Sequence, residues 1–111
     1  MSDLAIASVV TVYATFADAE EAERIARALV EERLAACANI LGPMRSIYRW
    51  DGKIEDATEV AALFKTRADE AEALIARLGA LHSYEVPAAV VWPIAHALPA
   101  YAEWVAAETR R

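Results

Sequence analysis

Cysteine, glycine and proline are scarce in this chain of 111 residues, which has one cysteine, three glycines and four prolines. A single cysteine, Cys37, cannot form an internal disulfide. The low glycine and proline content excludes a collagenous or low-complexity chain, and a hydrophobic content of 58% excludes intrinsic disorder. Because the length suits one hydrophobic core, we expect residues 1–111 to form a single domain.

Basic residues are also few, with 11 lysines and arginines against 17 aspartates and glutamates and a formal net charge of −6. Phosphate backbones and anionic lipids repel such a chain, so neither nucleic acid nor a membrane surface is an expected partner. No apolar run approaches the roughly 18 residues of a membrane span. The start Met1-Ser2-Asp3 lacks the basic region of a signal peptide, and we expect a cytoplasmic protein.

Strand-like and helix-like patterns alternate along the first half of the chain. The β-branched run over 6–13 predicts a buried strand. Asp18 is a good N-cap for a helix whose apolar stripe covers 22–30. Extended apolar segments then lie on both sides of Asp51-Gly52, with a bend or bulge at Gly42-Pro43. Asp51-Gly52 is a strong signal for a type I′ hairpin turn, because that turn needs positive φ at both central residues.

The second half of the chain repeats the pattern. The strand that returns from the turn runs to Thr66, and Thr66 with Asp69 resembles a capping box. The apolar stripe of a second helix covers 71–78, and Gly79 is expected to close it. A last strand follows over 88–92.

A third, C-terminal helix is predicted to open at Pro99 and to face inward with Tyr101, Trp104 and Val105. The resulting order is strand, helix, strand, strand, helix, strand, helix. This order predicts an α+β fold, the ferredoxin-like split βαβ sandwich, with a long central β-hairpin and an extra C-terminal helix.

The predicted hairpin is longer than the domain that carries it. Strands of about 13 residues reach roughly 43 Å, whereas a helix of about 13 residues covers roughly 20 Å. The excess length exposes apolar and aromatic residues and open strand edges, which monomers avoid. We therefore expect a homo-oligomer whose contacts include Tyr48, Trp50 and Gly52. The alternative is that residues 53–58 form a solvated loop.

The sequence has no nucleophile motif, phosphate-binding glycine loop or dinucleotide fingerprint, so an enzyme is not expected. His82, Tyr84 and Glu85 place an imidazole, a phenol and a carboxylate just before a strand. His82 and Glu85 are candidate ligands of a divalent metal, with Cys37 a third. The alternatives are a hydrogen-bond network that holds a loop, and a cysteine that packs as a small apolar residue. Lys65 is either a surface residue at a strand end or a cation in a cleft between subunits.

Long segments of the chain resemble the CutA family of divalent-cation tolerance proteins. They are residues 22–40 and 46–54, Leu63-Phe64-Lys65-Thr66, His82-Ser83-Tyr84-Glu85-Val86-Pro87 and Pro99-Ala100-Tyr101-Ala102-Glu103-Trp104. The resemblance covers nearly the whole chain. It implies a tight homotrimer in which long hairpins wrap neighbouring subunits, and clefts between subunits like those of the PII signalling proteins. It also implies a link to copper and other divalent metals.

The chain departs from the family pattern at positions that the resemblance implies for metal binding. Ala14 stands where some members have a cysteine, and Leu81 precedes His82 where some have a second histidine. One hypothesis is a trimer that binds a divalent metal such as copper weakly in a cleft between subunits, through His82, Glu85 and Cys37. A second is a PII-like module that takes a small anionic effector near Lys65 and Tyr84. A third is a trimeric scaffold with no ligand of its own.

Overall fold

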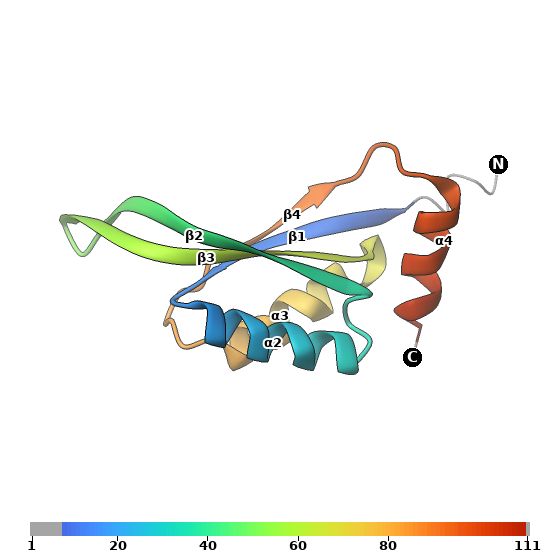
Figure 1. Ribbon diagram of the computed structural model, residues 1–111, viewed down its shortest axis with the longest axis horizontal. Helices are drawn as coiled ribbons and strands as arrows, with labels where there is room; N and C mark the ends of the chain where they lie inside the picture. The colour runs from blue at the N-terminus through green and yellow to red at the C-terminus, as the bar shows by residue number, and fades with distance from the viewer. Residues whose placement is uncertain (1–7, 111) are drawn as a thin grey trace.

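The computed structural model describes residues 8–110. One sheet is covered on one face by two helices, and a further helix lies at one end of the sheet (Figure 1). In chain order the elements are β1 (Val9–Phe16), α2 (Ala19–Glu31), β2 (Cys37–Trp50), β3 (Lys53–Arg67), the 3-10 turn η1 (Ala68–Glu70), α3 (Ala71–Leu81), β4 (Ala89–Pro93) and α4 (Pro99–Glu108).

The four strands form an antiparallel sheet in the order β2-β3-β1-β4, with β1 in the interior. Each half of the chain supplies a strand, a helix and a strand, and the central hairpin joins the two halves. This topology confirms the predicted α+β, ferredoxin-like sandwich with its additional C-terminal helix. Most of the later site residues belong to β1, to the hairpin or to the segment before β4, whereas Glu21 lies in α2 and Tyr101 in α4.

The main core lies between the sheet and helices α2 and α3. Alternate residues of β1 and β3 point toward the helices, since side chains in a strand alternate between its two faces. The largest fully buried apolar side chains there are Phe16, Ile25, Leu29, Phe64, Leu74 and Leu78. Asp18 caps α2 as predicted, and its carboxylate accepts a hydrogen bond from the Glu21 backbone N–H at 2.8 Å.

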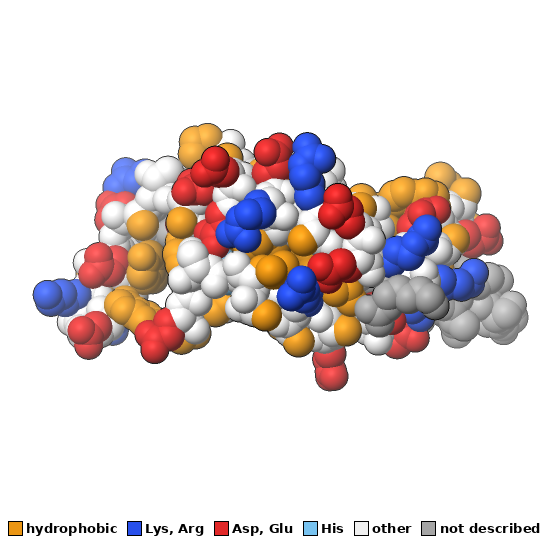
Figure 2. Space-filling model, turned by 90° about the horizontal axis from the view of Figure 1, so that it is seen from below, with side chains coloured by type: hydrophobic (Ala, Val, Ile, Leu, Met, Phe, Trp, Pro, Cys, Tyr) orange, Lys and Arg blue, Asp and Glu red, His pale blue; other side chains and the backbone are white. Residues whose placement is uncertain are grey.

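The outer surface of these two helices is covered with charged side chains of both signs (Figure 2). Several form ion pairs, including Arg77 with Glu32 at 2.9 Å. Such pairs contribute little to stability, but they show that this surface faces water. None of the helices in the described part of the chain is long and apolar enough to cross a membrane.

Four predicted details differ from the structure. The first strand begins at Val9 and continues to Phe16, while Ile6 and Ala7 lie outside the described residues. Gly79 does not close α3, which continues to Leu81 because an isolated glycine is tolerated inside a helix. The other two differences concern Thr66, near the end of β3, and Trp104, within α4.

Thr66 does not start a capping box, because it is fully buried in β3. The strand instead runs on to Arg67, whose guanidinium binds Asp69 at 2.7 Å and donates to the Thr109 carbonyl at 3.2 Å. Trp104 does not face inward and is 42% exposed, whereas Val105 is fully buried against Val9.

The hairpin extends far beyond the body of the molecule (Figure 1). Pairing between β3 and β1 stops at Val60, and residues 44–50 and 53–59 pair only with each other. We call residues 44–59 the overhang. Asp51 and Gly52 have φ of 52° and 77°, as predicted for the turn, and the register shift around Gly42-Pro43 confirms the predicted bulge. The alternative interpretation, a solvated loop over 53–58, is wrong, because these residues form the first part of β3.

Candidate ligand groove

The segment from His82 to Val86 joins α3 to β4, and the His82 ring anchors it. The ring is fully buried and stacks on Phe16, with centroids 5.0 Å apart. Its Nε2 lies 2.7 Å from the Thr15 carbonyl oxygen, and its Nδ1 accepts a hydrogen bond from the Tyr84 N–H at 3.1 Å. Because a carbonyl oxygen only accepts, Nε2 must carry the proton. Both ring nitrogens are therefore engaged within the chain.

Glu21 fastens the same segment to the start of α2. Its carboxylate accepts a hydrogen bond from the Ser83 N–H at 2.7 Å and another from the Ala17 N–H at 3.4 Å. Burial works against the charged carboxylate, but the hydrogen bonds from Ser83 and Ala17 outweigh it, so the pKa of Glu21 lies below its ordinary value. Glu21 and His82 together fix where the next two side chains, Tyr84 and Glu85, emerge.

Tyr84 and Glu59 connect this segment to the hairpin. The Tyr84 hydroxyl donates to Glu59 Oε2 at 2.6 Å, although the two residues are 25 positions apart in sequence. Glu59 is only 7% exposed. Burial, followed by the hydrogen bond to Glu59 and the charge of that carboxylate, raises the pKa of Tyr84 well above its ordinary value. The phenol therefore remains a neutral donor.

A groove of about 730 Å³ lies between the overhang and the segment before β4. Its hairpin side is formed by Ile47, Tyr48 and Trp50, and its opposite side by Tyr84, Glu85 and Val86. Tyr13 and Thr15 of β1 also line it, together with Glu59. This volume lies in the range of small-molecule sites. Two predicted interface residues, Tyr48 and Trp50, are thus also groove residues, whereas Gly52 lies at the hairpin tip.

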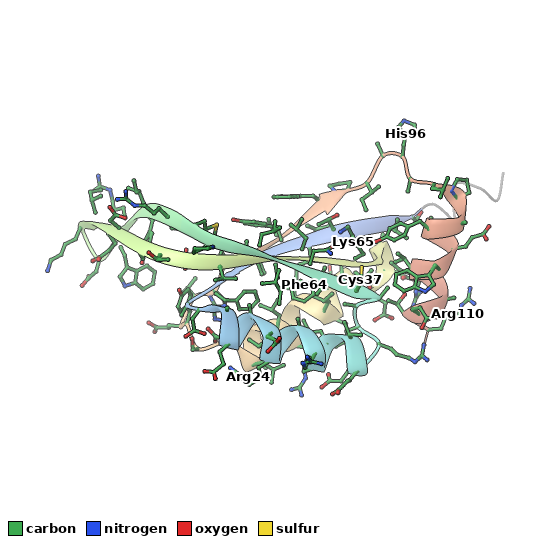
Figure 3. The ribbon with its side chains drawn as sticks, in the orientation of Figure 1. Arg24, Cys37, Phe64, Lys65, His96 and Arg110 are labelled. Carbon is green, nitrogen blue, oxygen red and sulfur yellow. The ribbon has the colours of Figure 1, made fainter. Side chains whose placement is uncertain are left out.

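Cys37 and Lys65 lie together at another part of the sheet, near the end that carries α4 (Figure 3). They are directly opposite each other across β2 and β3. The Cys37 Sγ is 3.5 Å from the Tyr101 hydroxyl, and burial together with this contact raises the pKa of Tyr101 to about 12. Lys65 is six positions from Glu59 on β3, or roughly 20 Å along a strand.

The predicted site residues therefore do not converge within one chain. Among residues 8–110 no three His, Cys, Asp or Glu side chains are grouped closely enough to hold a metal ion. Of the three candidate ligands, His82 uses both nitrogens internally, and Cys37 lies far from the groove. Glu85 is exposed and lines the groove. Lys65 likewise does not share the groove with Tyr84.

A model of the family described as CutA1 divalent ion tolerance protein matches residues 10–108. The chain belongs to this family. The divalent-cation tolerance protein CutA of Pyrococcus horikoshii is 43% identical over 102 residues, which cover 92% of this chain and 99% of the relative. The CutA of Thermus thermophilus is 46% identical over 90 residues, 81% of this chain and 87% of the relative.

Solved CutA structures also match the fold. The crystal structure of CutA from Xylella fastidiosa aligns with a TM-score of 0.90 at 43% identity, covering 93% of this chain and 99% of that one. The protein described as periplasmic divalent cation tolerance protein CutA from Archaeoglobus fulgidus aligns with a TM-score of 0.89 at 39% identity, covering 92% and 99%. The resemblance to the CutA family is thereby confirmed.

Sequence reasoning missed two residues that shape the site: Glu59, which lines the groove, and Glu21, which fastens the segment before β4. Glu59 precedes the buried run Val60-Ala61-Ala62 in β3, and an acidic residue adjoining such a run was the available signal. Glu21 stands three residues after the Asp18 N-cap, as in a capping box, and is only 7% exposed. Its role became visible only when the fold brought Ser83 within hydrogen-bond distance.

Proposed function

We propose that this CutA-family chain acts in divalent-cation tolerance as a homotrimer that holds a divalent metal weakly in the clefts between its subunits. The overhang carries the proposal. Its large apolar side chains are between 42% and 70% exposed, namely Ile47, Tyr48, Trp50 and Ile54. A two-stranded ribbon is marginally stable alone in water and has open edges. A neighbouring copy that covers Tyr48, Trp50 and the turn at Gly52 would stabilise it.

In this proposal the groove supplies the first metal ligand, Glu85, with Glu59 beside it. Carboxylate oxygens suit hard cations such as magnesium and manganese, while imidazole suits copper and zinc. Copper binding by His82 would require the ring to give up a hydrogen bond that holds the segment. Cys37 would have to come from another subunit. One chain thus provides an incomplete ligand set, and we expect weak binding.

The test is calorimetric titration of the tag-free protein with Cu(II), Zn(II) and Mn(II), with light scattering on the same sample. We expect a trimer that binds about one metal per protomer with a Kd on the order of micromolar. Glu85→Gln should weaken binding about tenfold without changing the subunit number. His82→Ala decides whether the imidazole coordinates copper, since only a ligand role predicts a loss confined to Cu(II) and Zn(II). A confirmed trimer without saturable metal binding would contradict the proposal.

The PII-like alternative, an anionic effector near Lys65 and Tyr84, has less support. The groove beside Tyr84 contains two carboxylates and no lysine, arginine or histidine. Lys65 lies about 20 Å away along β3. A melting screen with nucleotides and small carboxylates tests this alternative, and a stabilising shift that Lys65→Ala abolishes would restore it.

We also propose a cytoplasmic location and a role without catalysis. The acidic composition and the missing catalytic motifs support these two points. One relative, from Archaeoglobus fulgidus, is described as periplasmic. Fractionation of cells that express the untagged chain, followed by immunoblotting, is the direct test of location.

A further inference from the structure

We propose that the C-terminal helix α4 is a strap, which opens from the end of the sheet as a unit while the rest of the chain stays folded. Three features carry this inference: a small apolar contact separate from the main core, a pair of arginines at one end of the helix, and a tyrosine that lies over the single thiol of the chain. The inference goes beyond the proposed function and depends on neither the metal nor the groove.

The apolar contact under α4 is small. Its buried residues are Ala102 and Val105 on the helix and Val9 and Ala36 beneath it. The main core, between the sheet and helices α2 and α3, contains phenylalanine, leucine and isoleucine side chains instead. Because hydrophobic stabilisation grows with the apolar area that is buried, α4 is held less strongly than α2 and α3. Its departure from the end of the sheet therefore costs less than global unfolding and leaves the main core closed (Figure 1).

Two arginines hold the C-terminal end of α4. Arg33 donates to the Glu108 carbonyl oxygen at 3.2 Å. Arg67 donates to the Thr109 carbonyl oxygen at the same distance. The last carbonyls of a helix have no partner within the helix, and positive side chains suit the negative end of its dipole. At the other end, Leu98 has no polar side chain with which to cap the helix. These charged contacts therefore act at the C-terminal end of the strap.

The backbone of Arg33 supports its role in holding α4. Its φ is 61°, in the left-handed region that glycine usually occupies after a helix. An arginine in this conformation has a backbone cost that a glycine would avoid. Its guanidinium also lies 3.7 Å from the Glu108 carboxylate. The contact with α4 is therefore what this side chain contributes at a position that otherwise favours glycine.

Tyr101 is the residue of α4 that lies beside Cys37. Its hydroxyl is 3.5 Å from the Cys37 Sγ, and Cys37 is half-buried. Lys65 is directly opposite Cys37 on the neighbouring strand. When α4 opens, Tyr101 leaves, and the thiol faces solvent beside a positive charge that favours the reactive thiolate. Because the chain has one cysteine, the reactivity of Cys37 reports the opening of α4.

The test measures how fast Cys37 of the assembled protein reacts with N-ethylmaleimide, followed by mass spectrometry, at increasing urea concentration. We expect a reaction at least about a hundredfold slower than in the unfolded chain, because α4 is closed most of the time. It should also be at least about tenfold faster than global unfolding allows and depend only weakly on urea, since opening exposes little surface. A reaction as fast as in the unfolded chain, or one that follows global unfolding at every urea concentration, would overturn the inference.

Two variants loosen α4 and a third is the control. Val105→Ala removes part of the apolar contact and should speed the reaction of Cys37 at least about tenfold. Arg33→Gly removes one clamp and relieves the backbone, so it should speed the reaction about threefold with little change in melting temperature. Arg77→Ala breaks an exposed ion pair with Glu32 on α3 and should leave the rate unchanged. Unchanged rates in both α4 variants, or an equal rise in the control, would refute the strap.

Dilution separates α4 from a neighbouring copy as the cover of Cys37. If α4 is the cover, the rate of reaction per chain should not change when light scattering shows that subunits dissociate. A rate that rises on dilution, or with Ile54→Asp on the overhang, would assign the cover to a neighbouring subunit and overturn the inference. The labelling needs neither bound metal nor a trimer, so this test and the test of the proposed function fail separately.

Discussion

The body of the molecule buries its large apolar side chains under two helices, whereas the overhang exposes them. In the body, α2 and α3 cover the sheet, and Phe16 and Phe64 are fully buried between the layers. The outer helix surface is charged and paired within the chain (Figure 2). On the overhang, Ile47 and Ile54 are 70% and 62% exposed. One chain therefore completes the core between the sheet and its two helices, whereas the overhang, like Val90 and Trp92 of β4, leaves apolar surface exposed.

The groove lies where these two regions meet. Its hairpin side comes from the overhang, and its other side is the segment that Glu21 and His82 fasten to the body. A rigid body thus presents Tyr84 and Glu85 to a ribbon that is itself open to contacts. We therefore expect stability to depend mainly on the body, and the proposed assembly and binding to depend mainly on the overhang.

The largest effect on stability is expected from the body. Phe64→Ala removes a fully buried ring and should lower the free energy of unfolding by about 3–5 kcal/mol. Val30→Ala, at a 39% exposed position of α2, should cost less than about 0.5 kcal/mol. Urea unfolding followed by circular dichroism measures both. Similar losses of unfolding free energy in the two variants would show that the buried core and the helix surface do not differ in their contribution to stability.

Substitutions on the overhang, in contrast, should change the assembly of subunits. Ile54→Asp places a charge on the apolar overhang and should reduce the subunit number in light scattering while leaving the circular dichroism spectrum unchanged. Val30→Asp makes the same chemical change on the outer surface of α2 and should leave the assembly intact. If Val30→Asp dissociates the protein and Ile54→Asp does not, the contacts lie on the helices.

Substitutions of two glycines should change the free energy of unfolding by smaller amounts and in opposite directions. Gly52 has φ of +77° in the hairpin turn, so Gly52→Val should cost about 1–2 kcal/mol and loosen the assembly. Gly79 lies inside α3 with open space where an added methyl group would point, so Gly79→Ala should stabilise the protein by about 0.5–1 kcal/mol. Thermal unfolding of both variants is the measurement. A neutral Gly52→Val would show that the turn relaxes without cost.

The smallest expected effect is the pH dependence contributed by Glu21. Its pKa in the folded protein lies below the ordinary value of 4.5, so its charge adds stability above pH 4.5 that is lost as the pH falls through the folded pKa. Glu21→Gln should therefore be less stable than the unmodified chain at pH 7, by about 1 kcal/mol, and the gap should narrow below pH 4.5. Glu23→Gln, on the same helix, is the control. A gap that is constant from pH 7 to about pH 3 would contradict this role.

Local signals predicted the fold well. The Asp51-Gly52 turn and the Asp18 cap are short-range features that need only a few neighbouring residues, and both were confirmed. The overhang was predicted by comparing two lengths, which is also local information. Thr66 misled the prediction because a cap sequence was buried in a strand instead, where packing against the core decides the conformation.

The site was less predictable because its geometry depends on distant contacts. His82, Tyr84 and Glu85 were singled out from their sequence proximity, but their roles follow from Thr15 and Glu59, which lie far away in the chain. An imidazole next to a carboxylate in sequence can coordinate a metal or hold a turn. Only the two hydrogen bonds of the ring show that it holds the segment here.

The interior place of β1 has a consequence for how the chain is made. β1 precedes both of its partners in the chain, which are residues 60–67 and 89–93. The β2–β3 hairpin joins neighbouring segments and needs no other part of the chain. Pairing between strands that are distant in sequence is slower than pairing between neighbouring strands. We therefore expect the hairpin to form on the ribosome before β1 pairs with β3 and β4. During that interval the nascent chain exposes the strand that is most buried in the folded protein, and we expect a chaperone to bind at this stage.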